Sequence, residues 1–567
     1  MENTSNRISR CIIGLLPKHG VRRVFVSPGS RNTPLLLALS RCDELKHEVV
    51  VDERSAAFMA LGYSLISGEP VALICTSGSA LLNYAPAIAE AYYRRVPLIV
   101  ISADRPKQWI GQDDSQTIVQ PGALRNYVKR SYDIYASDSD DELWFANRVT
   151  NDALLTAVTG RTGPVHLNVQ LSEPLNRLSR CDVEDFHVER LIRLVTPKPL
   201  LEVSEARKLG CMLASPLKIM IVCGFMNPDK TLNAALKKLS LLPNFAILTE
   251  TVSNLHSSDF VSSIDATLAS IREEDSDAMK PDIVITCGGA LISRHIKQYL
   301  RSVRLRGHWH VGIADDTIDC FRQLTMRIEL DPAMFFQQLA SAMQPHRDHS
   351  DYSRMWRVAA DRADAMTNAF AAKSSWCDLK AFATLIPMIP RRWNVQFSNG
   401  TAIRYAQIFG RHQYHRCDCN RGVSGIDGST STAIGGALAY ERDATLLISG
   451  DMSASYDSGC LIDTKIPSRF KMIVIENGGG GIFRFIPSTS NLDILDSMLS
   501  LPEIRSIMPM ASVNGFKAFL ACDESALREV FPLFAAHHAG PALLVIDTRS
   551  ANSAQVMRDI FQFYKTH

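Results

Sequence analysis

Two short segments in the last third of the chain combine oxygen-bearing side chains with closely spaced glycines. Residues 450–454 read Gly-Asp-Met-Ser-Ala, and residues 476–483 read Glu-Asn-Gly-Gly-Gly-Gly-Ile-Phe. Carboxylate and amide oxygens such as those of Asp451 and Asn477 are the ligands that Mg²⁺ prefers, often beside a phosphate group. Glycine lets the main chain approach a ligand closely. We therefore interpret the two segments as a site for a metal-bound diphosphate, although either segment alone is also typical of an ordinary strand end with a polar turn.

The apolar runs that lead into these segments predict the elements that hold them. Residues 446–449 and 472–475 are apolar and strand-length, so we expect two adjacent parallel strands with a helix between them. Ligands bind where the carboxyl ends of such strands meet. Strand-like and helix-like segments alternate along the whole chain, and the expected strands are 21–26, 71–75, 98–102, 163–169, 218–222, 245–248, 282–287, 308–313, 395–398, 446–449, 472–475 and 542–546. This alternation predicts an α/β fold with three successive doubly wound parallel-sheet domains.

The length of 567 residues agrees with about three domains. We place them at 1–185, 190–350 and 353–567, with a polar helical connector at about 352–374. The composition, 46% hydrophobic and 21% charged, is that of an ordinary globular protein. A formal net charge of +2 gives no electrostatic reason to expect a nucleic-acid partner. No secretory signal and no membrane-length apolar stretch is apparent, so we expect a cytoplasmic enzyme without an integral membrane segment.

Charged and polar side chains also follow the expected strands of the first domain. Glu53 precedes a helix, where a carboxylate could simply favour the positive helix end. Ser30 and Arg31 follow a Pro-Gly turn, and Arg105 follows another strand. Arginine at a strand end suits bidentate recognition of a carboxylate, although any one of these arginines could instead form a surface salt bridge. Gln116 lies in a loop rich in amides and hydroxyls.

The pair of segments at 450–454 and 476–483 resembles the signature of thiamine-diphosphate enzymes. That signature is a Gly-Asp-Gly element followed at similar spacing by Asn-Asn, and the resemblance implies that Asp451, Asn477 and the carbonyl of Gly479 bind Mg²⁺. It also implies that Glu53 hydrogen-bonds the aminopyrimidine ring and activates the cofactor. Two residues depart from the signature: Met452 replaces its last glycine, and Glu476 replaces its first asparagine. Glu476 could enter the core or face away from the metal.

A narrower resemblance comes from several longer motifs. Residues 28–34 (Pro-Gly-Ser-Arg-Asn-Thr-Pro), 102–106 (Ser-Ala-Asp-Arg-Pro), 398–404 (Ser-Asn-Gly-Thr-Ala-Ile-Arg) and 421–428 (Arg-Gly-Val-Ser-Gly-Ile-Asp-Gly) resemble those of the 2-succinyl-5-enolpyruvyl-6-hydroxy-3-cyclohexene-1-carboxylate synthase family of menaquinone biosynthesis. The resemblance extends from about residue 20 to the last strand. It implies a transferase that decarboxylates 2-oxoglutarate on thiamine diphosphate and adds the remaining four-carbon unit to isochorismate.

The same resemblance assigns site residues. It implies a cofactor site of thiamine diphosphate and Mg²⁺, with Mn²⁺ tolerated, formed by Glu53, Thr76, Gln116, Gly400, Thr401, Ser424, Ile426, Asp451, Ser453, Ala454, Asn477 and Ile482. It implies a substrate site for several carboxylates, formed by Ser30, Arg31, Arg105, Gln116, Arg294, Arg404, Arg421 and Phe483. Ile426 and Phe483 could also be core residues.

The resemblance further implies a homodimer or homotetramer, because in this superfamily the cofactor lies between two subunits. Gly400 stands where the family usually has a serine, and the adjacent Thr401 could replace the lost hydroxyl. Two alternatives stay open: another thiamine-diphosphate decarboxylase or carboligase, such as an acetolactate-synthase-like enzyme, and an inactive relative with a binding role.

Overall fold

The computed structural model describes residues 2–135, 137, 139–180, 190–213, 216–313, 317–343, 351–410, 414–463, 465–486, 488–501 and 504–566. The chain divides into two compact units. The first unit contains residues 1–196, 422–445 and 456–470, and the second contains 197–421, 446–455 and 471–567. The expected domain limits at residues 185 and 350 lie outside the described residues.

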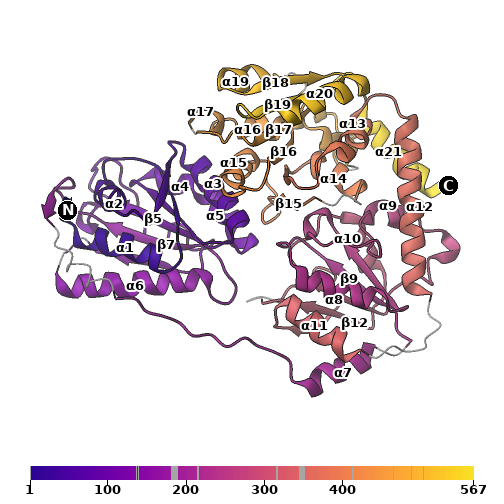
Figure 1. The fold of residues 1–567 in the computed structure, drawn as a ribbon, viewed down its shortest axis with the longest axis horizontal. Helices are drawn as coiled ribbons and strands as arrows, with labels where there is room; N and C mark the ends of the chain where they lie inside the picture. The colour runs from indigo at the N-terminus through magenta and orange to yellow at the C-terminus, as the bar shows by residue number, and fades with distance from the viewer. Residues whose placement is uncertain are drawn as a thin grey trace. The chain divides into compact units, whose positions relative to one another are not determined.

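The first unit is built on a six-stranded sheet in which all neighbouring strands are parallel. The strand order is β3 (Lys46–Val49), β2 (Arg23–Val26), β4 (Val71–Cys75), β5 (Leu98–Asp104), β7 (Val165–Gln170) and β6 (Ser131–Ile134). One face packs against α1 (Arg7–Lys18), α2 (Thr33–Leu39) and α6 (Asp140–Val158) in a continuous apolar core (Figure 1). Because helices cover the sheet, its inner strands β4, β5 and β7 are buried along their length, and β4 is wholly apolar.

Helix α3 (Glu53–Ser67) lies against the other face of this sheet and carries Glu53 at its first position. A second helix, α15 (Ser429–Ala439), packs so closely on α3 that glycine is required at the contact. A Cβ atom on Gly62 would lie 1.9 Å from the carbonyl oxygen of Thr432, and one on Gly435 would lie 1.9 Å from that of Met59. Because α3 is covered in this way, most of its residues are buried and apolar.

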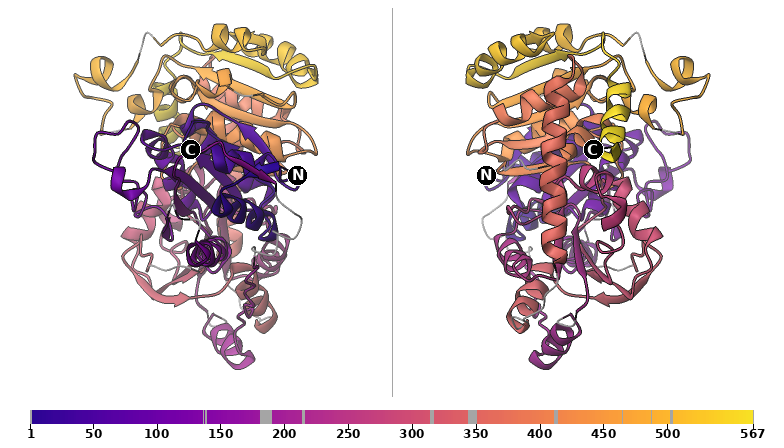
Figure 2. Two further views of the ribbon diagram at one scale, coloured as in Figure 1. Left: turned by 90° about the vertical axis from the view of Figure 1, so that its left-hand side faces the viewer. Right: turned by 90° about the vertical axis from the view of Figure 1, so that its right-hand side faces the viewer.

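The second unit contains two sheets. The central sheet has the order β10 (Phe245–Thr249), β9 (Ile219–Cys223), β11 (Ile283–Cys287), β12 (Gly307–Val311) and β13 (Leu324–Ile328), with all neighbours parallel. Helices α7 (Val203–Leu213), α8 (Lys230–Ser240) and α11 (Pro332–Ala342) pack in the apolar core of one face, and α10 (Arg294–Ser302) in that of the other. The long helix α12 (Tyr352–Lys373) joins the second core through Trp356, and it is seen along its length in the right-hand view of Figure 2.

The carboxyl-terminal sheet carries the glycine-rich segments. Its order is β15 (Arg416–Cys419), β14 (Asn394–Phe397), β16 (Thr445–Gly450), β17 (Phe470–Glu476), β19 (Ala542–Asp547) and β18 (Lys517–Ala521). Strands β16 and β17 are therefore neighbours, as predicted, and the connection between them contains α16 (Asp451–Tyr456) and α17 (Cys460–Asp463). Helices α13 (Asp378–Leu385), α14 (Thr401–Ile408), α18 (Gly481–Phe485), α19 (Met508–Val513), α20 (Glu524–Ala536) and α21 (Ser553–Thr566) complete this part of the unit.

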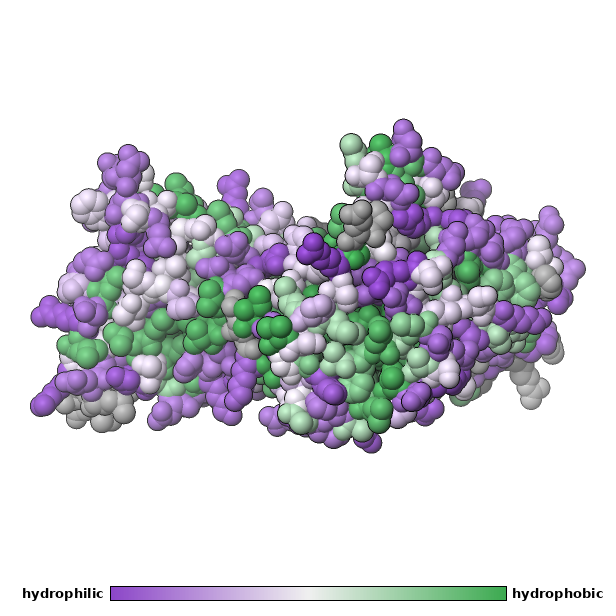
Figure 3. Space-filling view, turned by 90° about the horizontal axis from the view of Figure 1, so that it is seen from above, coloured by the Kyte–Doolittle hydropathy of each residue, from purple (hydrophilic) through white to green (hydrophobic). Residues whose placement is uncertain are grey.

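The predicted fold class is confirmed, because three parallel α/β sheets follow one another along the chain. Every expected strand is present to within two residues, and the expected connector at 352–374 is α12. The sequence reading missed β3, β6, β13, β15 and β18, and also a small antiparallel pair, β1 (Glu2–Thr4) with β8 (Leu178–Arg180). On the face shown in Figure 3, hydrophobic and hydrophilic residues are interspersed. Among the described residues, no helix is long and apolar enough to cross a membrane.

Candidate active site

Asp451 ties the ends of β16 and β17 together. Its Oδ2 accepts hydrogen bonds from the main-chain N–H groups of Asn477, Gly478 and Gly479, at 3.1, 3.0 and 2.9 Å. Its Oδ1 accepts another from the N–H of Met452 at 2.8 Å. Burial raises the pKa of this carboxyl, although the four N–H donors oppose that rise. The two segments that the sequence singled out thus form one structure at the carboxyl edge of the sheet.

The turn that faces Asp451 requires glycine. Gly478, Gly479 and Gly480 have φ angles of 88°, 68° and 75°, in the left-handed region that other residues rarely adopt. At Gly479 there is also no room for a side chain, because a Cβ atom would lie 2.5 Å from the carbonyl oxygen of Leu501. The run of glycines therefore has a conformational cause.

The oxygens at this turn fit a magnesium ion. Asn477 donates its Nδ2 to Asp378 at 2.8 Å, which leaves its Oδ1 as an acceptor. Together with the Asp451 carboxylate and the Gly479 carbonyl, it is the kind of hard oxygen ligand that Mg²⁺ binds. Glu476 lies in the core beside this turn, with Oε2 3.9 Å from Nη2 of Arg549.

The residues expected to contact a diphosphate lie on the same part of the second unit. Ser453 and Ala454 are buried in α16, and Thr401 is the first residue of α14. Gly400 has a φ of 99°, and no described atom lies within 4 Å of a Cβ built there, so its conformation rather than crowding favours glycine. Ile482 and Phe483 are half-buried in α18.

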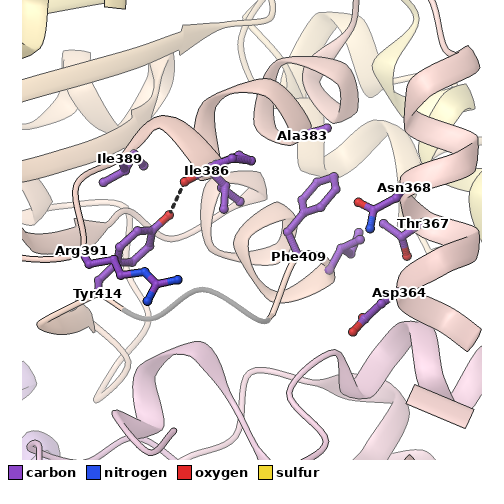
Figure 4. A pocket seen from close by; sticks show the side chains of 11 residues that line it. Asp364, Thr367, Asn368, Ala383, Ile386, Ile389, Arg391, Phe409 and Tyr414 are labelled. Carbon is purple, nitrogen blue, oxygen red and sulfur yellow. Dashed lines mark hydrogen bonds between the residues drawn. The ribbon is translucent and has the colours of Figure 1, made fainter. Parts of the chain in front are cut away.

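A cavity of about 430 Å³ lies beside Asn477, one of the residues expected to bind magnesium. Thr401, Asn477 and Gly478 line it together with Asp378 and residues 549–554. Another cavity, of about 410 Å³, lies between α12, α13 and the end of α14, where Tyr414 donates to the carbonyl of Ile386 at 3.0 Å (Figure 4). None of the predicted site residues lines that second cavity.

Three of the predicted arginines gather in the second unit. Burial lowers the pKa of Arg404, and the positive charges of Arg294 and Arg421 act in the same direction. Arg421 donates through Nη1 to Oδ1 of Asn399 at 3.0 Å, and Arg294 begins α10 with its side chain exposed. This concentration of guanidinium groups is suited to binding a substrate with more than one carboxylate.

Glu250 supports this cluster and was missed by the sequence reading. Its buried carboxylate accepts the N–H of Ile292 at 2.8 Å and that of Ser293 at 2.7 Å, immediately before Arg294. Burial raises its pKa to about 7, although these N–H donors and the charge of Arg421 oppose the rise. An acidic residue after an apolar strand was the available signal, but its partners lie some forty residues further along the chain.

In the first unit, Glu53 does not cap α3. Asp52 is the cap, because its Oδ1 accepts the N–H groups of Arg54 and Ser55 at 3.0 and 3.4 Å. The Glu53 carboxylate is half-buried and accepts Nδ2 of Asn83 at 3.4 Å. The hydrogen-bonding cap of α3 is therefore Asp52, whereas Glu53 lies in the first turn, where its charge can still favour the positive helix end.

The other first-unit candidates form two groups. Arg31 is buried and paired with Glu173 at 3.1 Å, while the exposed Ser30 precedes it. Arg105 is paired with Asp114 at 2.9 Å. Burial lowers the pKa of Arg31, and the positive charge of Arg105 acts in the same direction, so the two guanidinium groups lie near each other. The second group lies around the end of β4, and its members are Thr76, Ser77, Gly78 and Gln116.

Thr76 and Gln116 differ in their surroundings. Thr76 is 6% exposed, and its Oγ1 has no hydrogen-bond partner among the residues that the structure describes. Such an orphaned buried hydroxyl fits a site that binds a polar ligand. The exposed Gln116 has a φ of 55°, and its carbonyl accepts Oγ of Ser77 at 2.8 Å.

The loop that carries Ser424 and Ile426 is held by Glu90, a second residue that the sequence reading missed. Glu90 is buried in α5 (Ala85–Arg94) and accepts the N–H groups of Gly422 and Val423 at 2.7 and 2.6 Å. Ile426 is 36% exposed, so the alternative of a core isoleucine is wrong. Ser424 has a φ of 70°.

Comparisons with known proteins agree with this geometry. Residues 6–123 match the family model described as thiamine pyrophosphate enzyme, N-terminal TPP binding domain. The fold and this match define a thiamine-diphosphate-dependent enzyme.

Curated relatives narrow the class further. The chain is 37% identical to the 2-succinyl-5-enolpyruvyl-6-hydroxy-3-cyclohexene-1-carboxylate synthase of Porphyromonas gingivalis over 97% of this chain and 96% of that protein. Proteins of the same name from Flavobacterium psychrophilum and Flavobacterium johnsoniae are 35% and 33% identical, over 92% and 98% of both chains. The chain therefore belongs to the 2-succinyl-5-enolpyruvyl-6-hydroxy-3-cyclohexene-1-carboxylate synthase family, which acts on small molecules.

Proposed function

We propose that this enzyme uses thiamine diphosphate and Mg²⁺ to decarboxylate 2-oxoglutarate and to add the resulting four-carbon unit to isochorismate. The product would be 2-succinyl-5-enolpyruvyl-6-hydroxy-3-cyclohexene-1-carboxylate, in menaquinone biosynthesis. The observation that carries the proposal is the Asp451–Asn477–Gly479 turn, found in a chain related over nearly its full length to synthases of that name.

The cofactor residues would act as follows. Asp451, Asn477 and the carbonyl of Gly479 would hold Mg²⁺, or Mn²⁺ in its place, against the diphosphate. Ser453, Ala454, Gly400 and Thr401 would contact the phosphate groups. Glu53 would hold a proton at the ring nitrogen of the aminopyrimidine, with Thr76, Gln116, Ser424, Ile426 and Ile482 around the cofactor. When bound, the cofactor supplies the electron sink, and the protein supplies geometry and charge.

The arginines would bind and orient the two substrates. Arg31 and Arg105 in the first unit, and Arg294, Arg404 and Arg421 in the second, provide planar guanidinium groups for bidentate binding of carboxylates. Ser30, Gln116 and Phe483 would complete the substrate contacts. Because Arg31 and Arg105 already pair with Glu173 and Asp114, an incoming carboxylate would compete with these acidic partners.

We also propose a homodimer or homotetramer in the cytoplasm, with domains at 1–185, 190–350 and 353–567. Large apolar side chains near Glu53 support an interface there. Val51, two residues before Glu53, is 63% exposed, and Leu82, next to its partner Asn83, is 48% exposed. Exposed apolar residues that flank a functional side chain are typical of a surface covered by a partner.

The central sheet argues against a dinucleotide-dependent relative such as an acetolactate-synthase-like enzyme. In a doubly wound sheet, a dinucleotide binds where the loops after two adjacent central strands diverge. Here the loops after β9 and β11 are in contact, because a Cβ atom on Gly224 would lie 1.9 Å from the carbonyl oxygen of Gly289.

The proposal is tested by following isochorismate absorbance with enzyme, Mg²⁺, thiamine diphosphate and 2-oxoglutarate, and with each component left out in turn. We expect consumption only in the complete mixture. Release of CO₂ from 2-oxoglutarate while isochorismate persists would overturn the assignment of the acceptor. Failure to turn over 2-oxoglutarate with the cofactor bound would overturn the proposed reaction and favour an inactive relative.

A further inference from the structure

Asp378 is a buried carboxylate that contacts a proposed magnesium ligand. It is 1% exposed and begins α13. Its Oδ2 accepts Nδ2 of Asn477 at 2.8 Å, and its Oδ1 accepts the hydroxyl of Thr548 at 2.6 Å. Its own N–H donates to Oγ of Ser553 at 3.0 Å. These contacts join three segments that are far apart in the sequence.

The bonds of this carboxylate do not serve its own helix. An acidic residue in the first turn of a helix is usually explained by capping or by the positive helix end. Here both oxygens are engaged by side chains from other segments, Asn477 and Thr548. The direction of the Asn477 amide is therefore the feature that Asp378 determines.

The direction of that amide decides whether Asn477 can bind a cation. An asparagine side chain has one acceptor oxygen and one donor nitrogen at the ends of a planar group. Both oxygens of the Asp378 carboxylate accept hydrogen bonds, and Oδ2 accepts from Asn477, so Asp378 selects the rotamer in which Nδ2 points to it and Oδ1 points away. The opposite rotamer would turn two N–H donors toward the cation.

We propose that Asp378 is a positioning residue that holds Oδ1 of Asn477 toward the cation bound by Asp451, Asn477 and Gly479. The inference rests on the proposed function, because it requires that cation. Outer partners that orient metal ligands commonly contribute about 10–100-fold to metal affinity. Asp378 would supply such a contribution without touching the metal.

The interaction can be reversed by exchanging the two residues. In Asn477→Asp, a second carboxylate would face Asp378, and the repulsion would disturb an otherwise suitable ligand. In Asp378→Asn, the new amide can turn and donate to Oδ1 of Asn477, which occupies the oxygen that the cation needs. In the double variant D378N/N477D, the amide introduced on α13 would donate to one oxygen of the carboxylate introduced at the glycine turn and leave the other oxygen for the cation.

The experiment is a Mg²⁺ titration of the full-length protein at fixed thiamine diphosphate, with cofactor binding read from the quenching of tryptophan fluorescence. We expect the Mg²⁺ midpoint to rise by about 10–100-fold in each single variant, and to return toward the wild-type value in the double variant. Thr548→Val is the matched control. It removes the other hydrogen bond to Asp378, so it should lower the melting temperature while leaving the Mg²⁺ midpoint near that of the wild type.

A Mg²⁺ midpoint in Asp378→Asn equal to that of the wild type would overturn the inference. So would a double variant that binds Mg²⁺ no better than the weaker single variant, or a Thr548→Val protein that loses Mg²⁺ affinity as much as Asp378→Asn does. If the wild type itself shows no Mg²⁺-dependent binding of thiamine diphosphate, the proposed function fails and the inference fails with it.

Discussion

Substituting Glu250 with glutamine should remove a pH dependence from the stability of the second unit. The pKa of this buried carboxyl rises from 4.5 to about 7 on folding. Because the folded-state pKa lies above the unfolded one, the stabilising contribution is fully present below pH 4.5 and is lost as pH rises through 7. At 1.36 kcal/mol per pKa unit, the full change is about 3 kcal/mol, of which about 2 kcal/mol falls between pH 5.5 and 8.

Glutamine keeps the shape of the side chain but does not titrate. Its Oε1 can still accept the N–H groups of Ile292 and Ser293, whereas its amide group replaces Oε2, the second acceptor of the Ile292 N–H, and faces that donor. That mismatch should cost about 1–3 kcal/mol at every pH. The difference in unfolding free energy between wild type and Glu250→Gln should therefore shrink as pH rises.

Urea unfolding followed by tryptophan fluorescence, at several pH values between 5.5 and 8, measures this difference. Other titrating groups, such as Asp457 with a pKa raised to about 6 by burial, are common to both proteins and cancel. Glu529→Gln, at an exposed position on α20, is the control and should show no pH-dependent difference. A wild-type minus Glu250→Gln difference that is constant across the pH range would refute the reasoning.

Three further predictions follow from the packing and the charges. Gly435→Ala should lower the melting temperature of the first unit, because the clash of the new methyl group with the main chain would cost about 1–3 kcal/mol and outweigh a gain in helix propensity of up to about 1 kcal/mol. The control Gly540→Ala should not lower the melting temperature, because its Cβ atom would lie 3.7 Å from the nearest atom. Equal melting temperatures of the two variants would contradict the packing argument. Arg404→Met should raise KM for 2-oxoglutarate or isochorismate by about 10–100-fold, because a charged hydrogen bond worth about 1.5–3 kcal/mol is lost. An unchanged KM for both substrates in steady-state assays would exclude Arg404 from the substrate site. Glu90→Gln should weaken the binding of thiamine diphosphate measured by calorimetry, because either the N–H of Gly422 or that of Val423 loses its acceptor. A wild-type affinity would show that the loop of Ser424 and Ile426 needs no support from Glu90.

The strands that the sequence did not predict share a physical cause. The five missed strands of the large sheets, β3, β6, β13, β15 and β18, all lie at sheet edges. Edge strands are commonly short and polar, because they pair with a neighbour on one side only and helices cover them incompletely. Strand β3 reads Lys-His-Glu-Val and is largely exposed, so it lacks the continuous apolar run that revealed inner strands such as β4.

The residues of the candidate site also differ in whether the sequence could predict them. Asp451 and the 477–479 turn could be predicted, because strand ends and consecutive glycines are local features of the sequence. Asp378, Glu250 and Glu90 could not, since each acts through hydrogen bonds to segments at least 42 positions away. Their sequence neighbourhoods are those of ordinary acidic residues near a helix or strand. Their hydrogen-bond partners become apparent only in the folded structure.

The most direct test of the account concerns Glu53 and the cofactor. Exchange of the C2 proton of thiamine diphosphate with deuterium, quenched in acid and followed by NMR, reports activation of the cofactor without either substrate. We predict fast exchange on the wild-type enzyme with Mg²⁺, and exchange close to that of free cofactor on Glu53→Gln, with cofactor binding verified by calorimetry for both. Equal exchange rates on the two proteins, both with cofactor bound, would contradict the assignment of Glu53 as the activating residue.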